Sequence, residues 1–299
     1  MSTTSKLKTN ESQQNLKLKI GLAFFLGLFA LGLATWLGDF AANNWGYNYQ
    51  KRMLVQSLVM SGIVLLGVWF LRKRFDRRFP NSIGLGSASN ALKNFLFGMS
   101  IIVLPMAITL GFTELFGWAN IKINTNASVL QAILPGIAFV LLFEALPEEL
   151  LFRGYIYSNL NTRYRRWKSA LLTVGLFVLL SMLIVPFQKY LFGISGDIGG
   201  SDSITGSYII AMIFFGAFVV YLRILTNSVW AGIGFHLVFV YVNRLMGLED
   251  TKLFQFTEFT SEVPAQITFI STLLLSFLGL ILYPRFKKQS LGWQEIQDK

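Results

Sequence analysis

The chain of 299 residues contains no cysteine, a single histidine and few charged residues. Without cysteine it can form neither disulfides nor thiolate metal sites, and a cysteine nucleophile is excluded. One histidine also restricts zinc chemistry, because zinc sites usually draw on several histidines or cysteines. Charged residues make up 14% of the chain, whereas a soluble domain carries about 25%. Together with a mean hydropathy of +0.54, this shortage argues against a soluble enzyme and for a protein embedded in lipid.

The apolar residues are gathered in long stretches. A helix that crosses the roughly 30 Å hydrocarbon core of a bilayer needs about 20 apolar residues. Eight stretches meet this requirement, approximately over residues 20–37, 53–71, 92–115, 128–160, 169–186, 204–222, 226–242 and 264–283. We therefore predict an all-α, polytopic membrane helix bundle of about eight transmembrane helices, flanked by polar tails over residues 1–19 and 286–299. Only Arg223 to Leu225 separate the sixth and seventh stretches, which predicts a tight helical hairpin.

The net charge of +11 is unevenly distributed. If the loops alternate between the two sides of the membrane, one set of loops and tails holds 19 Lys and Arg residues, and the other holds six. Basic residues on short loops favour the cytoplasmic side, so both termini are expected in the cytosol. Topology and anionic lipid then explain the positive charge without nucleic acid. We expect a multi-pass protein of a bacterial plasma membrane, whose partners are the lipid bilayer and a peptide or membrane protein.

The fourth stretch concentrates ionisable residues at membrane depth, where such residues are costly and usually functional. It carries Glu144, Glu148, Glu149 and Arg153. Glu144 and Glu148 are four residues apart and therefore share a helical face. Glu149 and Arg153 have the same spacing in the favourable acid-then-base order, which predicts an ion pair and leaves Glu148 less neutralised. Pro147 should kink this helix about one turn earlier, because proline removes a backbone hydrogen bond.

Residues of two other stretches lie at a similar depth. Counted at 1.5 Å per residue from the expected cytosolic ends, Glu148, Ser181 and His236 are all about 18 to 23 Å deep. Residues at one level of a helical bundle can form a buried polar site. Gly232 and Gly234 should let the helix of His236 approach a neighbour closely. The alternative interpretation is structural, with a salt-bridge network that only locks helices together and a histidine that only bonds a neighbouring helix.

The fourth stretch also contains a motif, the string EELLFRGY that starts at Glu148. This string resembles the first motif of the CPBP family of intramembrane metalloproteases, which includes CAAX prenyl proteases and bacteriocin-processing (Abi-type) enzymes. The segment from Ser228 to His236 is similar to the helix that carries the last histidine of that family. The resemblance covers about residues 134–243. It implies an eight-helix membrane endopeptidase whose site opens toward the cytosol.

The resemblance also implies roles for individual residues. Glu148 would activate water, Glu149 and Arg153 would support it, and His236 would stabilise the oxyanion. A divalent metal such as zinc is a candidate cofactor. A catalytic zinc site needs three protein ligands, which Glu148, His236 and one further carboxylate would have to supply.

Two positions depart from the family pattern. Phe177 begins the string F-x-x-x-S, so Ser181 stands where the family has a histidine. Val240 replaces the asparagine or aspartate expected four residues after His236, although Asn243 one turn further is a substitute. Serine is a poor base, and the loss of one oxyanion donor typically costs about 100- to 1000-fold in rate. Candidates for lining a cavity around the site are Glu144, Ser181, Val240 and Asn243.

These departures leave three functions open. The first is peptide-bond hydrolysis by glutamate-activated water in a membrane cavity. The second is a catalytically degenerate homologue that acts as a membrane scaffold or regulator. The third is a transporter or proton relay, since ionisable residues at membrane depth often mark such paths, but the chain lacks the internal repeats typical of transporters.

Overall fold

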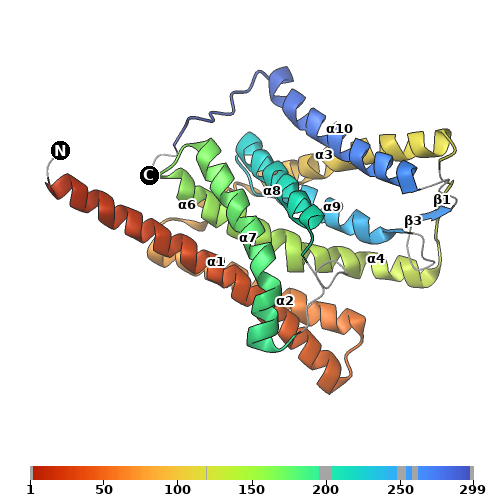
Figure 1. The fold of residues 1–299 in the computed structure, drawn as a ribbon, viewed down its shortest axis with the longest axis horizontal. Coiled ribbons are helices and arrows are strands. Elements are labelled where there is room, and N and C mark those ends of the chain that lie inside the picture. The colour runs from red at the N-terminus through yellow and green to blue at the C-terminus, as the bar shows by residue number, and fades with distance from the viewer. Residues whose placement is uncertain (1–2, 119, 195–203, 248–253, 258–261, 297–299) are drawn as a thin grey trace.

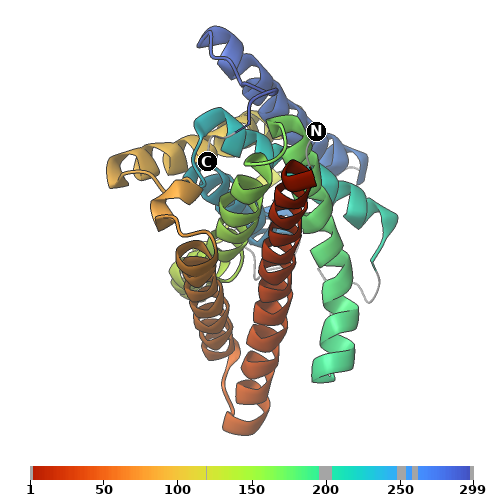
Figure 2. The same cartoon turned by 90° about the vertical axis from the view of Figure 1, so that its left-hand side faces the viewer.

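The computed structural model describes residues 3–118, 120–194, 204–247, 254–257 and 262–296, and their helices form an elongated bundle (Figures 1 and 2). Within these ranges, six helices are long and apolar enough to cross a membrane, and two further apolar helices are shorter. Each of the eight predicted stretches is thus helical, and the all-α, polytopic class is confirmed.

The regular helices are α1 (Thr3–Trp45), α2 (Tyr49–Phe70), α3 (Ala88–Leu115), α4 (Ala127–Phe139), α5 (Leu146–Glu149), α6 (Tyr157–Asn161), α7 (Arg166–Phe192), α8 (Gly206–Thr226), α9 (Trp230–Leu245) and α10 (Glu262–Phe286). The irregular helical segments are η1 (Leu71–Phe75), η2 (Pro80–Ile83), η3 (Val140–Ala145) and η4 (Leu150–Ile156). Because α1 begins at Thr3, helical structure extends through much of the segment expected as a polar tail.

Three short strands, β1 (Asn120–Ile123), β2 (Met246–Gly247) and β3 (Phe254–Thr257), form a small sheet within the described residues. β3 lies in the middle, antiparallel to β1 and parallel to β2. This sheet was not predicted. It connects the chain that follows α3 with the chain that follows α9, at one end of the bundle (Figure 1).

The fourth span is a composite helix of α4, η3, α5, η4 and α6. Pro147 has no N–H group and cannot donate to the carbonyl of Phe143. Directly before it, the chain widens into the π-helical segment η3, which includes Phe143, so the helix is irregular where the kink was predicted. A second π-helical segment, η4, carries Arg153 and was not predicted. Such π-helical turns are frequent at functional sites.

The hairpin between the sixth and seventh spans was placed wrongly. α8 continues to Thr226, and Asn227 ends it with a left-handed backbone (φ 52°). Arg223 is therefore inside the helix, and only 3% of its surface is exposed. Its Nε donates to the carbonyl of Arg153 at 3.1 Å, and its Nη1 donates to Asn227 Oδ1 at 2.9 Å. Because these oxygen atoms accept the hydrogen bonds of the guanidinium, Arg223 can lie inside a helix. Its charge was therefore not a sign of a loop.

Two glycines let α3 and α9 pack with their backbones in close contact. A Cβ atom on Gly98 would overlap the carbonyl of Ala231 on α9, and one on Gly234 would overlap the carbonyl of Phe95 on α3. The close approach expected for Gly234 is therefore present, and Gly98 is its counterpart on the neighbouring helix. This contact sets the position of α9, which carries His236.

The glycine contact can be tested with a matched pair on α3. Gly98→Ala should lower the free energy of unfolding by about 1 to 3 kcal/mol, because the added methyl group forces two backbones apart. Gly111→Ala should be neutral or stabilising, since no described neighbour lies within 4 Å of its Cβ position. Thermal unfolding in detergent, followed by circular dichroism, measures both. Equal losses for the two variants would contradict a close α3–α9 contact.

Candidate active site

The centre of the site is the buried carboxylate of Glu149. Its Oε1 accepts a hydrogen bond from Arg153 Nη1 at 3.0 Å and lies 3.1 Å from His236 Nδ1. The ion pair predicted from the four-residue spacing is thus present, and α9 adds the only histidine of the sequence to it. Gly232 makes this approach feasible, because a Cβ there would lie 2.8 Å from Glu149 Oε2. The fourth and seventh spans therefore meet at Glu149 and His236. The depth predicted for His236 was counted from Arg223, which lies inside α8, whereas α9 begins at Trp230.

Aromatic rings and a backbone carbonyl hold the two partners of Glu149, Arg153 and His236. The Arg153 guanidinium lies 4.5 Å from the centre of the Phe177 ring, and its Nη2 donates to the carbonyl of Gly216 at 3.3 Å. A cation over an aromatic face is attracted electrostatically. The His236 ring meets the Phe215 ring edge-on, with 4.7 Å between the ring centres. Phe177, the first residue of F-x-x-x-S, thus positions Arg153.

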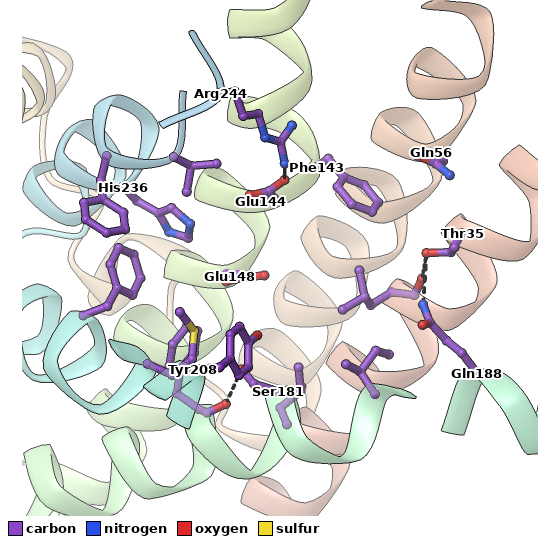
Figure 3. A pocket seen from close by; sticks show the side chains of 18 of the residues that line it. Thr35, Gln56, Phe143, Glu144, Glu148, Ser181, Gln188, Tyr208, His236 and Arg244 are labelled. Carbon is purple, nitrogen blue, oxygen red and sulfur yellow. Dashed lines mark hydrogen bonds and ion pairs between the residues drawn. The ribbon is translucent and has the colours of Figure 1, made fainter. Parts of the chain in front are cut away.

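Glu148 faces a cavity of about 630 Å³ instead (Figure 3). Among the described residues it has neither a hydrogen-bond partner nor an ion-pair partner, which distinguishes it from its neighbour in the chain. The same cavity is lined by Ser181, His236 and Val240, and by Glu144, which forms an ion pair with Arg244. The structure therefore brings together three of the four residues suggested as cavity-lining, next to Glu148 and His236. The side chain of the fourth, Asn243, lies outside the described residues.

The two positions that depart from the family pattern supply little chemistry. The Ser181 hydroxyl donates to the carbonyl of Phe177 at 3.1 Å, and it also shares a hydrogen bond with the Tyr208 phenol. A hydroxyl engaged in this way does not replace an imidazole base. Val240 presents only carbon atoms to the cavity. Besides the glutamate pair and the arginine, His236 is therefore the one motif residue that still carries the functional group found in the family.

The described residues do not make the proposed metal-ligand set. They include no group of three His, Cys, Asp or Glu side chains arranged to hold a metal ion. The Glu149 oxygen nearest to His236 is already shared with the Arg153 guanidinium, whose charge disfavours a cation beside it.

Several residues around the cavity were not singled out from the sequence. Thr35, Gln56, Gln188, Tyr208 and Arg244 all line it. Glutamine inside an apolar stretch is itself a signal, since buried amides need hydrogen-bond partners. Tyrosine and threonine are too common in membrane helices to give such a signal.

Residues 130–242 match the family model of Rce1-like, type II CAAX prenyl endopeptidases. The match runs from α4 to α9 and includes the glutamate pair, Arg153 and His236. No curated protein and no solved structure gives a significant match to the chain.

The long apolar helices and this match support an integral membrane protein, and residues 130–242 are similar to a family of membrane endopeptidases. This family model is of the CPBP and CAAX protease type, and it matches the part of the chain where the motif resemblance was found.

The buried ion pair makes a prediction about stability. Arg153→Met should lower the free energy of unfolding by about 3 to 5 kcal/mol, because it leaves the buried Glu149 without its guanidinium partner. The double variant Glu149→Leu/Arg153→Met removes both charges and should recover much of this loss. Denaturant titration in detergent measures both variants. If Arg153→Met alone is as stable as the parent, Glu149 does not depend on this pair.

Proposed function

We propose that the protein is a membrane-embedded endopeptidase in which Glu148 activates water for attack on a peptide bond. The observation that supports this proposal is that the side chains of the two adjacent glutamates have different surroundings. Glu149 shares its Oε1 between Arg153 and His236, whereas Glu148 has no hydrogen-bond or ion-pair partner among the described residues and faces a cavity large enough for water and a peptide. A carboxylate within hydrogen-bond reach of a water molecule can act as a general base.

In the proposed reaction, Glu148 takes a proton from water as the water oxygen attacks the peptide carbonyl carbon. The carbonyl oxygen becomes an oxyanion, which a hydrogen bond from the His236 ring stabilises. Glu148 then returns the proton to the amide nitrogen as the C–N bond breaks, which yields a carboxylic acid and an amine. Glu149 and Arg153 are positioning residues here. Because a carboxylate only accepts hydrogen bonds, Glu149 requires a hydrogen on His236 Nδ1 and so fixes the orientation of the ring. Donation to the oxyanion then comes from Nε2 and requires the imidazolium form of the ring, in which both nitrogens carry a hydrogen.

A second function is favoured by a different observation. Ser181 is bonded to the backbone of its own helix and Val240 is apolar, so two family groups are missing from the cavity. A degenerate homologue would keep the cavity and bind a membrane-protein segment without cleaving it. It would act as a scaffold or regulator of its partner.

Glu148→Gln separates these two functions. In proteoliposomes supplied with prenylated and transmembrane model peptides, the variant should cleave at least about 100-fold more slowly than the parent, because glutamine cannot take the proton from water. Mass spectrometry of the products measures the rate. Glu114→Gln is the matched control, since this exposed residue near the end of α3 loses the same charge outside the cavity.

The contrary outcome supports the degenerate homologue. In that case the parent would cleave no more than Glu148→Gln, and Glu148→Gln would fully complement a deletion strain.

Ser181→His tests whether the F-x-x-x-S position limits the rate. The substitution places an imidazole on the wall of the same cavity as Glu148, and it should accelerate cleavage by about 100-fold, the lower end of what a positioned general base contributes. Ser181→Asn is the matched control, because it adds polar bulk without a base. An equal gain in both variants would refute a role in proton transfer.

A further inference from the structure

The two ends of the bundle differ in charge. The Lys19 ammonium lies 2.8 Å from Asp76 Oδ1, which joins the first half of α1 to the chain that follows α2. The backbone N–H of Arg166, at the start of α7, donates to the carbonyl of Glu295 at 3.0 Å, which joins this connection to the C-terminal segment. One end of the bundle therefore gathers the basic segments 72–78, 163–168 and 285–288. The start of α1 and the end of the described chain lie on this side as well (Figure 1).

The cavity extends toward the other end of the bundle. α7 leads away from the basic end, and its lining residues begin at Phe177 and continue to Gln188. α8 returns to the basic end, and it contributes only from Tyr208 to Phe215, in its first half. α9 leads away again and contributes from His236 to its last turn. Three helices thus line the cavity with the half that is farther from the basic end.

The first two helices show the same pattern. On α1 the lining residues are Leu31, Thr35 and Asp39, which approach its junction with α2. On α2 they are Arg52 and Gln56, within its first two turns. The Arg52 guanidinium lies 2.7 Å from Asp39 Oδ1, and both side chains are partly exposed. This ion pair therefore marks the outer rim of the cavity beside the short α1–α2 connection.

We infer that the cavity opens to the side of the membrane opposite the cytosol. The positive-inside rule assigns the basic end to the cytosol, so the rim formed by Asp39 and Arg52 faces the other compartment. Glu148 and His236 then lie at the inner end of a cavity that is reached from outside the cell. The resemblance to the CPBP family had implied the opposite access.

The residues that line the cavity indicate which kind of molecule binds in it. The rim charges of Asp39 and Arg52 neutralise one another, as do those of Glu144 and Arg244. Between these pairs lie neutral hydrogen-bonding groups, of which Gln188 Nε2 donates to Thr35 Oγ1 at 3.1 Å (Figure 3). Amide and hydroxyl groups beside apolar walls suit an extended polypeptide better than an ion. The occupant is thus a segment of an exported or surface-exposed polypeptide, and not the prenylated C-terminus of a cytosolic protein. This inference deepens the proposed function by naming its substrate class.

The absence of cysteine makes the direction of opening directly measurable. Single cysteines are introduced by Gln56→Cys and Ser181→Cys in the cavity, by Lys51→Cys beside the α1–α2 connection, and by Lys168→Cys at the basic end. Bacterial cells that express each variant are treated intact, or as inverted membrane vesicles, with a charged thiosulfonate that does not cross membranes. After denaturation, a polyethylene glycol maleimide is added, which reacts with the cysteines that the thiosulfonate left unmodified. The resulting mass shift measures the fraction of these cysteines. The same shift without pretreatment shows that each variant is present in the membrane.

We expect Gln56→Cys and Ser181→Cys to be modified at least about tenfold faster in intact cells than in inverted vesicles, as Lys51→Cys is. Lys168→Cys should show the reverse preference. Faster modification of the cavity cysteines in inverted vesicles would overturn the inference, and so would modification of Lys168→Cys in intact cells. If neither cavity cysteine reacts from either side while both exposed controls do, the cavity is closed to water and the inference is equally wrong. Two cavity positions on different helices guard against misfolding of one variant.

Labelling measures access and not cleavage, so this inference and the proposed reaction can fail separately. Cleavage that depends on Glu148, combined with labelling from the cytosolic side, would keep the peptidase and reject the outward opening. Labelling from outside without cleavage would keep the opening and identify a binding site for an exported segment.

Discussion

The structure depends on one buried carboxylate shared between an arginine and a histidine. Glu149 has no access to solvent, and a lone charge at membrane depth is expensive, so it must be compensated within the protein. Arg153 supplies that compensation from the same helix, and His236 on α9 contacts the same carboxylate oxygen. This requirement holds the fourth and seventh spans together. It also distinguishes two adjacent glutamates, since Glu149 is bonded within the protein while Glu148 faces the cavity.

Close packing of the neighbouring helices holds this carboxylate and its two partners in place. Gly232 lets Glu149 approach α9, and the glycine contacts between α3 and α9 hold α9 in place from its other side. Phe177 and the carbonyl of Gly216 fix the guanidinium, while Arg223 binds the carbonyl of Arg153 from the last turn of α8. Neither Ser181 nor Val240 belongs to this network. The hydrogen bonds of the Glu149 carboxylate therefore do not depend on the side chains at these two positions.

The position of the cavity shows how far a family likeness extends. The match over residues 130–242 accounts for the helices that carry the glutamate pair and the histidine. α1 and α2 lie outside the matched range, yet they supply Thr35, Asp39, Arg52 and Gln56 to the cavity wall. Access to a site is set by all the helices around it, whereas a motif describes only the residues at its centre. Function belongs to the site and not to the fold, and here the site includes parts that the motif does not cover.

The amino-acid sequence by itself determined the features that depend on neighbouring residues. Hydropathy fixed the eight helices, the placing of basic residues distinguished the two ends, Pro147 located the irregular turn, and a four-residue spacing predicted the Glu149–Arg153 pair. Only the tertiary structure decided that His236 bonds Glu149, that Arg223 is buried inside α8, and that Gln56 and Gln188 line the cavity. These features depend on which faces of distant helices meet. Helix packing sets those faces, and no local pattern of residues records them.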